Sequence, residues 1–407
     1  MKNTIVTLVI GAAVSIAVWV LVMSKVVPID SVFALFPIQI AIFTACAFFF
    51  SWTTVEIPRV GLKIAVALAG VALVLTCSWI VSLYEAAFLP CAASSAILLS
   101  LALGLLYGLT AHARRRRRME ALLGQRIAKK DFERVVEEDM LNNFRGTRVE
   151  ASVLVCEVHN QRELLAAMSP EDHSAMVNLY LQTTSDYLVS VGAYLDECTG
   201  EELRVVFGAP VPALDHATRA CRAALELLKR VDELNRECDA RWQQRLDVRV
   251  GIDSGDLVAA AYGGRRLAGF SVTGAAAGFA RRLCTACGTY GSRVLAGPDT
   301  VAQTGGEAFE VRSVEVLAVE TGRNRRVEIF EVLAPKGGLS EERERSREHF
   351  WRGVLFYREG SFKKALEEFQ QARITGLPDA TVEFYLHRVD RAMQGGNVER
   401  NPFSKEV

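Results

Sequence analysis

The sequence has no net charge that would draw it toward nucleic acid or acidic partners. Its 407 residues hold 47 lysines and arginines and 47 aspartates and glutamates, so the formal net charge at pH 7 is +0. A global electrostatic attraction to a polyanion is therefore not indicated. We expect no nucleic-acid partner.

Charge is almost absent from residues 1–113. Four apolar runs lie there, at approximately 4–23, 31–54, 64–83 and 91–111, each near the ~20 residues that a helix needs to cross a bilayer. No small-residue cleavage site stands out after the first run, and three more runs follow, so a signal peptide explains it less well. Buried helices of a soluble core are the less favoured alternative. We expect a four-helix transmembrane region at 1–113.

Histidine is missing from these runs, and no arginine lies inside them, so neither a haem site nor an ion path is indicated. The flanking charges predict the orientation. Lys2, Arg59, Lys63 and the arginines 114–118 fall on one side of a four-span topology, and Lys25 falls on the other. The positive-inside rule then places the N-terminus and the large C-terminal region in the cytoplasm, in a multi-pass protein of the inner cell membrane.

Cysteines lack the pairing expected of a disulfide framework or a metal site. Nine are scattered along the chain, and disulfides are rare in the cytoplasm. Cys284 and Cys287 have the spacing of a redox or metal pair, but no second pair or histidine cluster accompanies them. We favour a half-buried helix end over a reactive site.

Residues 114–148 form a charged linker with one apolar stripe. The spacing predicts a continuous helix leaving the membrane, with one shift of phase. This stripe could pair with its copy in a second chain as a short coiled coil, or pack on its own domain, and the sequence does not separate the two. The stripe consists of Met119, Leu123, Ile127, Phe132, Val136, Met140 and Phe144.

Residues 149–335 have the pattern of an α+β domain with a mainly antiparallel sheet. The segment 246–262, "LDVRVGIDSGDLVAAAY", is interpreted as two strands around a Ser-Gly-Asp turn. The other expected strands are 152–158, a hairpin near 193–197 and 202–207, "SRVLAG", and two strands in the segment 309–333. The expected helices are 170–190, 213–236 and about 275–287.

The tail at 341–395 is expected to be helical. Gly353, Gly360, Ala365, Phe369 and Ala372 match the spacing of one tetratricopeptide (TPR)-like helix pair of ~34 residues. One copy cannot bury a solenoid core, so we expect it to cap the preceding domain or a dimer partner.

Several segments in this order are similar to a known family. "SVLVCEV", "LDECTGEELRVVFGAP", "DHATRACRAALELLKRVDELN", "VRVGIDSGDLVAA", "GFSVTGAAAGFARRL" and "VEIFEVL" resemble the catalytic domain of class III adenylate/guanylate cyclases, over about 150–335. The resemblance implies a ferredoxin-like cyclase domain that works as a homodimer or with another cyclase domain. It also implies ATP or GTP as substrate and two divalent ions, Mg²⁺ or Mn²⁺, held by acidic side chains.

At the two metal-binding positions of that family, this sequence keeps an acidic residue but has a longer side chain. Glu157 stands where the family has an Asp at the end of the first strand, and Glu201 follows Gly200 where the second Asp is usual. An added methylene moves each carboxylate by more than ~1 Å, while Mg²⁺ demands near-ideal octahedral geometry. The phosphate loop after the first position, usually glycine-containing, reads His159-Asn160-Gln161, so its backbone approaches an anion less easily.

The base-reading and transition-state positions also depart from the family. Glu197 stands where the family has the lysine that reads adenine, and a carboxylate there resembles guanylate cyclases. The partner position for reading the base is Ser271. Arg282 occupies the family's transition-state arginine position, but the asparagine four residues earlier is Gly278. Losing one preorganised donor typically costs about 10²–10³ in rate.

Three functions follow from this resemblance. We favour a catalytically impaired or inactive pseudo-cyclase that acts by dimerisation, by nucleotide binding, or by pairing with an intact cyclase, because several functional positions depart together. The alternative is an active, divergent nucleotide cyclase, a phosphorus–oxygen lyase that releases pyrophosphate. A membrane scaffold with no nucleotide role is the third hypothesis.

Overall fold

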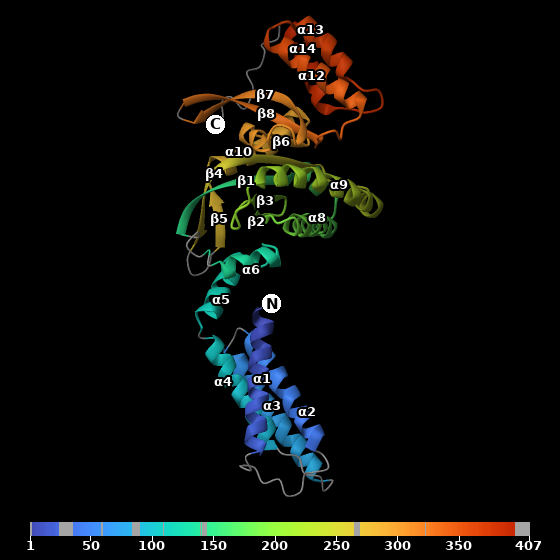
Figure 1. The fold of residues 1–407 in the computed structure, drawn as a ribbon. Coiled ribbons are helices and arrows are strands. Elements are labelled where there is room, and N and C mark those ends of the chain that lie inside the picture. The colour runs from blue at the N-terminus through green and yellow to red at the C-terminus, as the bar shows by residue number, and fades with distance from the viewer. Residues whose placement is uncertain are drawn as a thin grey trace. The chain divides into compact units, whose positions relative to one another are not determined.

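The computed structural model describes residues 2–23, 36–57, 60–83, 90–108, 110–138, 140, 145–263, 269–321 and 323–394. The chain divides into two compact units, Met1–Glu120 and Ala121–Val407 (Figure 1). Lys25, Arg59 and Phe144, which entered the expectations above, lie outside the described residues.

The first unit is a bundle of apolar helices: α1 (Lys2–Met23), α2 (Phe36–Glu56), α3 (Val60–Ser82) and α4 (Pro90–Gly108). Small and hydroxylated side chains bring α2 and α4 close together. A Cβ at Gly104 would lie 2.4 Å from Oγ1 of Thr54, and Ser51 donates to Ser100 at 3.2 Å. Close approach through small residues is typical of helix packing in membranes.

Two of these helices are long and apolar enough to cross a membrane. They are Val60–Val81 and Pro90–Gly108, whereas the apolar parts found in α1 and α2, Ile5–Val20 and Ile40–Glu56, are shorter. Large apolar side chains such as Trp19, Leu68 and Trp79 are exposed on the bundle. These findings are weak evidence for membrane association, and the four-span arrangement stays a prediction.

The linker is not the continuous helix that the sequence predicts. α5 (Ala111–Leu123) and α6 (Lys129–Glu137) are separated by a turn, in which Gly124 has a φ of +54°. This left-handed conformation suits glycine and ends α5, and the shift of the apolar stripe falls at this break. Ile127 and Val136 are buried within the single chain, which supports packing on the chain's own second unit over a coiled coil.

The second unit is built on one mixed sheet with the strand order β2-β3-β1-β4-β6-β8-β7, and β5 pairs with β4. All of these pairings are antiparallel except the parallel pair β4–β6, which confirms the expected α+β class. The strands are β1 (Arg145–Val158), β2 (Tyr194–Cys198), β3 (Glu202–Phe207), β4 (Val248–Tyr262), β5 (Gly269–Thr273), β6 (Val294–Ala296), β7 (Phe309–Thr321) and β8 (Arg323–Pro335).

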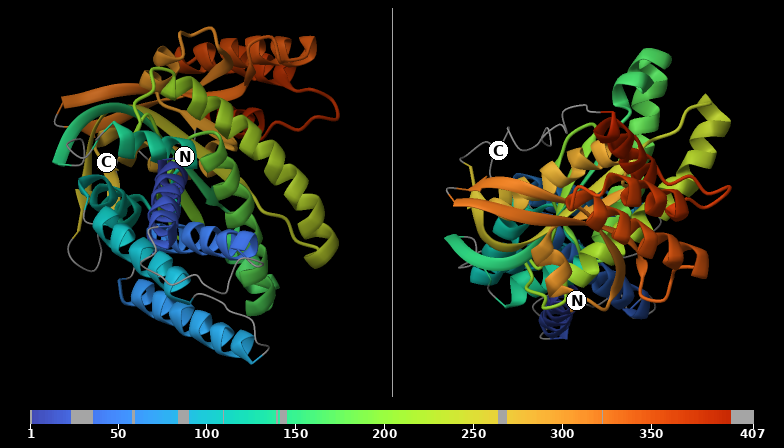
Figure 2. Two further views of the ribbon diagram at one scale, coloured as in Figure 1. Left: turned by 60° about the horizontal axis from the view of Figure 1, so that its bottom comes forward. Right: turned by 90° about the horizontal axis from the view of Figure 1, so that it is seen from above.

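Helices cover both faces of this sheet (Figures 1 and 2). α8 (Pro170–Ser190) and α9 (His216–Trp242) share a buried core with β1, β3 and β4, and the order β1-α8-β2-β3-α9-β4 is the ferredoxin-like arrangement. α10 (Ala275–Tyr290) packs against β6, β7 and β8 in a second core. Two short helices, α7 (Gln161–Ala167) and α11 (Pro298–Gln303), were not foreseen.

The prediction of two strands within 246–262 is wrong. Ser254, Gly255 and Asp256 do not turn but continue β4, opposite Ser152, Ala151 and Glu150 of β1. β1 is longer than the expected 152–158, and its added N-terminal residues give the Ser-Gly-Asp segment a partner along its whole length. Tertiary pairing therefore overrides the local turn signal.

The C-terminal segment packs on the cyclase-like part of the second unit. It consists of α12 (Glu341–Arg358), α13 (Phe362–Ala372) and α14 (Ala380–Met393). Gly353 lets α12 and α13 approach closely, since a Cβ there would lie 2.7 Å from the Phe369 ring. α14 contacts β7, where the Tyr385 hydroxyl donates to the Val314 carbonyl. The segment thus packs on its own domain and has three helices where a helix pair was expected, and its TPR-like character stays a prediction.

Candidate functional site

The β2–β3 hairpin and the end of β1 bring the acidic residues of the site together. Glu157 of β1 lies directly opposite Glu202 of β3, so both side chains project from the same face of the sheet. The hairpin turn is closed by Thr199, whose amide donates to the Glu202 carbonyl at 2.9 Å and whose Oγ1 accepts from the Glu202 amide at 3.2 Å. Glu201 sits within this turn, and its carbonyl accepts the Val158 N–H at 3.0 Å.

Glu157 is held in an environment that disfavours its charged form. Burial raises the pKa of its carboxyl, and the neighbouring carboxylates of Glu202 and Glu201 raise it further. His159 and Arg281 oppose these effects by lowering it. The carboxyl of Glu157 is therefore surrounded by charges of both signs, with Glu201 and Glu202 acting against Arg281 and His159.

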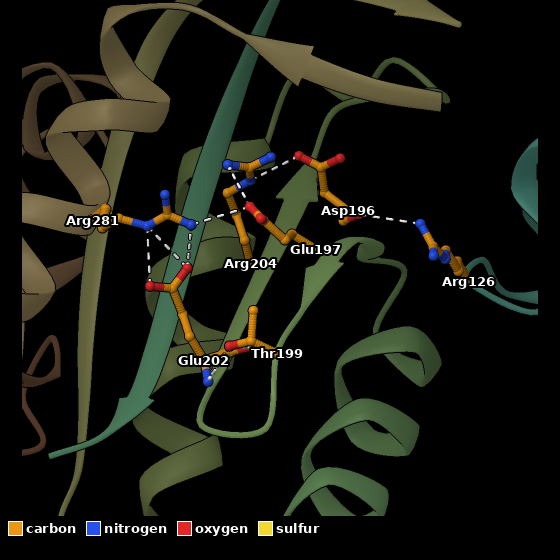
Figure 3. A network of polar contacts seen from close by, with 7 residues as sticks. All are labelled: Arg126, Asp196, Glu197, Thr199, Glu202, Arg204 and Arg281. Carbon is orange, nitrogen blue, oxygen red and sulfur yellow. Dashed lines mark hydrogen bonds and ion pairs between the residues drawn. The ribbon is translucent and has the colours of Figure 1, made fainter. Parts of the chain in front are cut away.

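Arg281 of α10 neutralises the acidic face within the same chain. Its Nε donates to both Oε1 and Oε2 of Glu202 at 3.0 Å, and its Nη2 donates to Oε2 of Glu197 at 3.1 Å (Figure 3). The Glu202 side chain is only 15% exposed in this pair. Bidentate pairing of guanidinium and carboxylate is a strong, directional contact, so an internal cation already sits beside Glu157.

Glu197 pairs with a second arginine. Arg204 lies opposite it on β3, with Nη1 2.9 Å from Oε2 of Glu197 and Nε 2.9 Å from Oδ2 of the buried Asp196 (Figure 3). Arg204 and Arg281 thus engage the Glu197 carboxylate, and the predicted base-reading role of Glu197 and Ser271 stays a prediction. Ser271 of β5 sits beside Asp196, whose pKa is raised by burial while Ser271 and Arg204 favour its charged form.

Arg282 points to a different set of groups from its neighbour Arg281. Its guanidinium lies 5.4 Å from the ring centroid of Phe279, and its buried Nε has no acceptor in the described part of the chain. Nearby Asp253 of β4 is 6% exposed. Burial raises the pKa of Asp253 to about 7, and Asp299 raises it as well, while Arg282 lowers it. Nothing within 4 Å occupies the place where a Gly278 side chain would begin.

The loop after Glu157 uses its polar groups for structure. The His159 amide donates to the Asp247 carbonyl at 2.7 Å. Asn160 donates to the Arg245 carbonyl at 2.8 Å and accepts from the Asp247 amide at 2.9 Å. These groups are therefore engaged within the protein in the place where the resemblance implies a phosphate loop.

Cys284 and Cys287 are buried thiols rather than a reactive pair. Their Sγ atoms donate to the carbonyls of Arg249 and Val250 at 3.2 and 3.4 Å, and burial raises the pKa of Cys287 to about 12. A thiol of this kind is a poor nucleophile and metal ligand. Within the described ranges, no group of three or more His, Cys, Asp or Glu side chains could hold a metal ion.

The structure thus groups Glu157, Glu197 and Glu201 at the end of β1 and the β2–β3 hairpin, with Ser271 beside Asp196 of that hairpin. Arg282 lies near Phe279 and Asp253 instead. The sequence reasoning missed the two arginines that pair with the acidic residues, Arg204 and Arg281. A signal for Arg281 was present in the sequence, since Asp196, Glu197, Glu201 and Glu202 lie within seven positions, and so many carboxylates call for counter-charges nearby.

Comparisons with known proteins agree with this fold. The family described as adenylate and guanylate cyclase catalytic domain matches residues 147–332. Adenylate cyclase 1 of Rhizobium meliloti (strain 1021) is 24% identical over 198 residues, which is 49% of this chain and 30% of that relative. The chain therefore spans less than a third of the length of this curated relative.

Two solved structures are similar to about half of this chain. The guanylyl cyclase Cya2 shares 22% identity, with 48% of this chain and 98% of the other covered and a TM-score of 0.43. The adenylyl cyclase CyaB from P. aeruginosa shares 22% identity, with 48% and 100% covered and a TM-score of 0.44. The match to the family model alone identifies residues 147–332 as a homology domain of the class III adenylate/guanylate cyclase family.

Proposed function

We propose that this chain is a membrane-anchored signalling protein whose cyclase homology domain is catalytically impaired or inactive. The observation that carries the proposal is the pairing of Arg281 with Glu202 and Glu197. A guanidinium held beside the predicted metal residue Glu157 competes with a divalent cation for the same negative charge. The domain would then act by dimerisation or by binding a nucleotide without turning it over.

The residues present fit Mg²⁺ or Mn²⁺ poorly. Glu157 has a raised pKa and borders Arg281, and Glu201 is the other predicted ligand. Magnesium is usually bound through carboxylates that keep near-octahedral geometry, and the lengthened side chains work against this. The loop at His159 and Asn160, with its polar groups engaged elsewhere, adds little for a triphosphate. We derive no reaction step through a metal in this arrangement.

An active, divergent cyclase is the second candidate. It is favoured by Arg282, which keeps the family's transition-state arginine, and by the carboxylates retained at Glu157 and Glu201. Such an enzyme would convert ATP or GTP to a cyclic nucleotide and pyrophosphate, with Mg²⁺ or Mn²⁺. Glu197 would favour GTP only after leaving its two arginine partners, because both contact its carboxylate.

One assay separates these candidates. The full-length protein in lipid nanodiscs is incubated with ATP or GTP and with Mg²⁺ or Mn²⁺, and cyclic nucleotide is quantified by mass spectrometry. The proposal expects no product above background. Product that disappears in Glu201→Ala but persists in the matched surface variant Glu307→Ala would overturn it. If no product forms, calorimetry with the two nucleotides distinguishes a nucleotide sensor from a scaffold.

For the membrane part, we propose that α1 to α4 all span the bilayer, with both the N-terminus and the second unit in the cytoplasm. The exposed apolar side chains on the bundle and the two helices of sufficient length support this topology. Cysteine labelling from each side of sealed inner-membrane vesicles tests it, with single reporters near position 30 and near position 86. Both positions should be accessible only from the periplasmic side.

We further propose that the domain pairs with a second copy or with another cyclase domain, since the family's site residues come from two domains. The C-terminal segment, α12 to α14, would serve as a single TPR-like repeat that caps its own domain. Its buried aromatic core, with Phe350, Phe369 and Tyr385 in ring contact, supports this role. Analytical ultracentrifugation of the detergent-solubilised chain measures the oligomeric state.

A further inference from the structure

The turn between α5 and α6 is attached to the hairpin that carries the site. The Arg126 carbonyl accepts the N–H of Leu195 at 2.8 Å, and Arg126 Nη1 donates to the Asp196 carbonyl at 3.3 Å (Figure 3). β2 is the end strand of the sheet, so these bonds satisfy backbone groups that have no neighbouring strand on that side. The linker therefore extends the hydrogen bonding of β2.

From this attachment, polar contacts continue to α10. Asp196 binds Arg204, and Arg204 also binds Glu197. Glu197 in turn accepts from Arg281, which holds Glu202. Figure 3 shows these side chains as one connected series from the linker to α10. A displacement at Arg126 can thus reach Arg281 through hydrogen-bonded groups alone.

The attachment is local. A cleft of about 520 Å³ separates the turn from the end of α8, and its lining includes Gln125 and Ala128 on the linker and Asp186 and Ser190 on α8. Arg126 itself is exposed, while the adjacent Ile127 is buried. Ile127 and the bonds of Arg126 to β2 are thus among the contacts that hold the turn, while the cleft leaves its other side without close packing. Such a contact can open without unfolding the domain.

We propose that the α5–α6 turn is a latch on β2 that passes displacement of the linker to the acidic hairpin and to Arg281. This inference deepens the proposed function, because it names the regulation of the same hairpin, and it rests on the N-terminal unit being the source of the signal. Closing the latch orders the ion pairs of Glu197 and Glu202. Opening it loosens β2 and the contact between Arg281 and Glu202.

Hydrogen–deuterium exchange of the full chain in nanodiscs tests the latch, because the Leu195 amide reports directly on its bond to Arg126. Arg126→Ala keeps the carbonyl that accepts from Leu195 but loses the Nη1 bond to the Asp196 carbonyl. We expect this loss to loosen the turn, to speed exchange at Leu195 by about tenfold, and to raise exchange in the peptide containing Arg281. Gly124→Ala should act in the same direction, because it strains a φ of +54° where no neighbouring atom is within 4 Å.

Matched controls are Arg134→Ala, an exposed arginine of α6 paired with Glu138, and Gly306→Ala, another left-handed glycine with an open surrounding. Neither should change exchange at Leu195. Fast exchange of Leu195 in the unmodified chain would overturn the latch. If exchange becomes faster in the hairpin but does not change in the peptide containing Arg281, transmission to α10 would be overturned. Cyclase activity does not enter this readout, so product formation would refute the proposed function without touching the latch.

Discussion

The guanidinium of Arg281 lies against the carboxylate of Glu202, with its Nε 3.0 Å from both carboxylate oxygens. The two residues are 79 positions apart and belong to α10 and β3. This contact joins α10, which carries Arg282, the predicted transition-state arginine, to the hairpin that carries Glu201, a predicted metal ligand. It is the main way in which the site differs from what its sequence motifs imply.

Removing this arginine should destabilise the second unit slightly. Arg281→Ala leaves the Glu202 carboxylate without its bidentate partner, and the pKa of Glu157 should rise further because Arg281 lowers it. The Arg281 side chain is 45% exposed, so solvent screening limits the expected loss to about 1 kcal/mol. Calorimetric unfolding at pH 7 measures this loss. Arg293→Ala, which removes an exposed pair with Asp232, should cost less, and equal losses would contradict the prediction.

Activity should return only when the ion pair is removed together with the altered ligands. A first variant carries Glu157→Asp, Glu201→Asp and Gly278→Asn, and the new asparagine has room to enter. A second variant adds Glu202→Gly and Arg281→Ala. We expect the second to exceed the first by at least about tenfold in Mn²⁺-dependent product, since effects at one site are not additive. Equal activity in the two variants would show that Arg281 does not obstruct the site.

Asp253 should make stability depend on pH in a defined direction. Its pKa in the fold is about 7, well above the ordinary value of 3.8. The folded state therefore favours the protonated acid. Stability from this group is complete at low pH and is lost as pH rises from about 4 to about 7.

Asp253→Asn removes the cost of ionisation. The variant's stability relative to the unmodified chain should be greater at pH 8 than at pH 5. Each unit by which folding raises the pKa of Asp253 corresponds to ~1.4 kcal/mol. Asp299 and Arg282 also act on this group and remain in both proteins. Chemical denaturation at the two pH values measures the difference, with Asp256→Asn, an exposed position on the same strand, as control. A difference that does not vary with pH would refute the raised pKa of Asp253.

The C-terminal segment should depend on a buried arginine for its attachment. Arg312 of β7 is 4% exposed and pairs with Glu331 of β8 and with Asp379 at the start of α14. Arg312→Met leaves the two carboxylates without their counter-charge, and such a loss typically lowers the free energy of unfolding by about 3–5 kcal/mol. Limited proteolysis should then release α12 to α14. Arg373→Met, at an exposed pair with Glu383, should leave the digestion pattern unchanged, and an unchanged pattern in Arg312→Met would contradict this role.

Local sequence patterns predicted the elements of the second unit well where tertiary contacts agreed with them. The helix expected at 170–190 is α8, with Ser169 as its N-cap and Pro170 in its first turn, a combination that favours helix initiation. The same reasoning failed at Ser254, Gly255 and Asp256, because β1 extends far enough to pair with them. A turn signal describes a local preference and cannot register a partner strand that lies far away in the sequence.

The candidate site was predictable in its acidic residues but not in its balance of charge. Motif spacing located Glu157, Glu197 and Glu201, since each occupies a fixed place in a strand or hairpin. Arg204 could have been paired with Glu197 only by knowing that the bulge of β2 makes the two residues opposite neighbours. Arg281 needed the packing of α10 against the sheet, which depends on contacts throughout the domain.

The latch at Arg126 and the attachment of α14 lie at β2 and β7, the two ends of the strand order. An uncovered edge strand presents unpaired backbone groups to which other chains can add as new strands, and this addition can lead to aggregation. Copies of a protein that is anchored as proposed above meet often, because they share one surface and one orientation. Covering both ends therefore lets such copies crowd together and still leave association to side-chain surfaces, which can be specific and reversible.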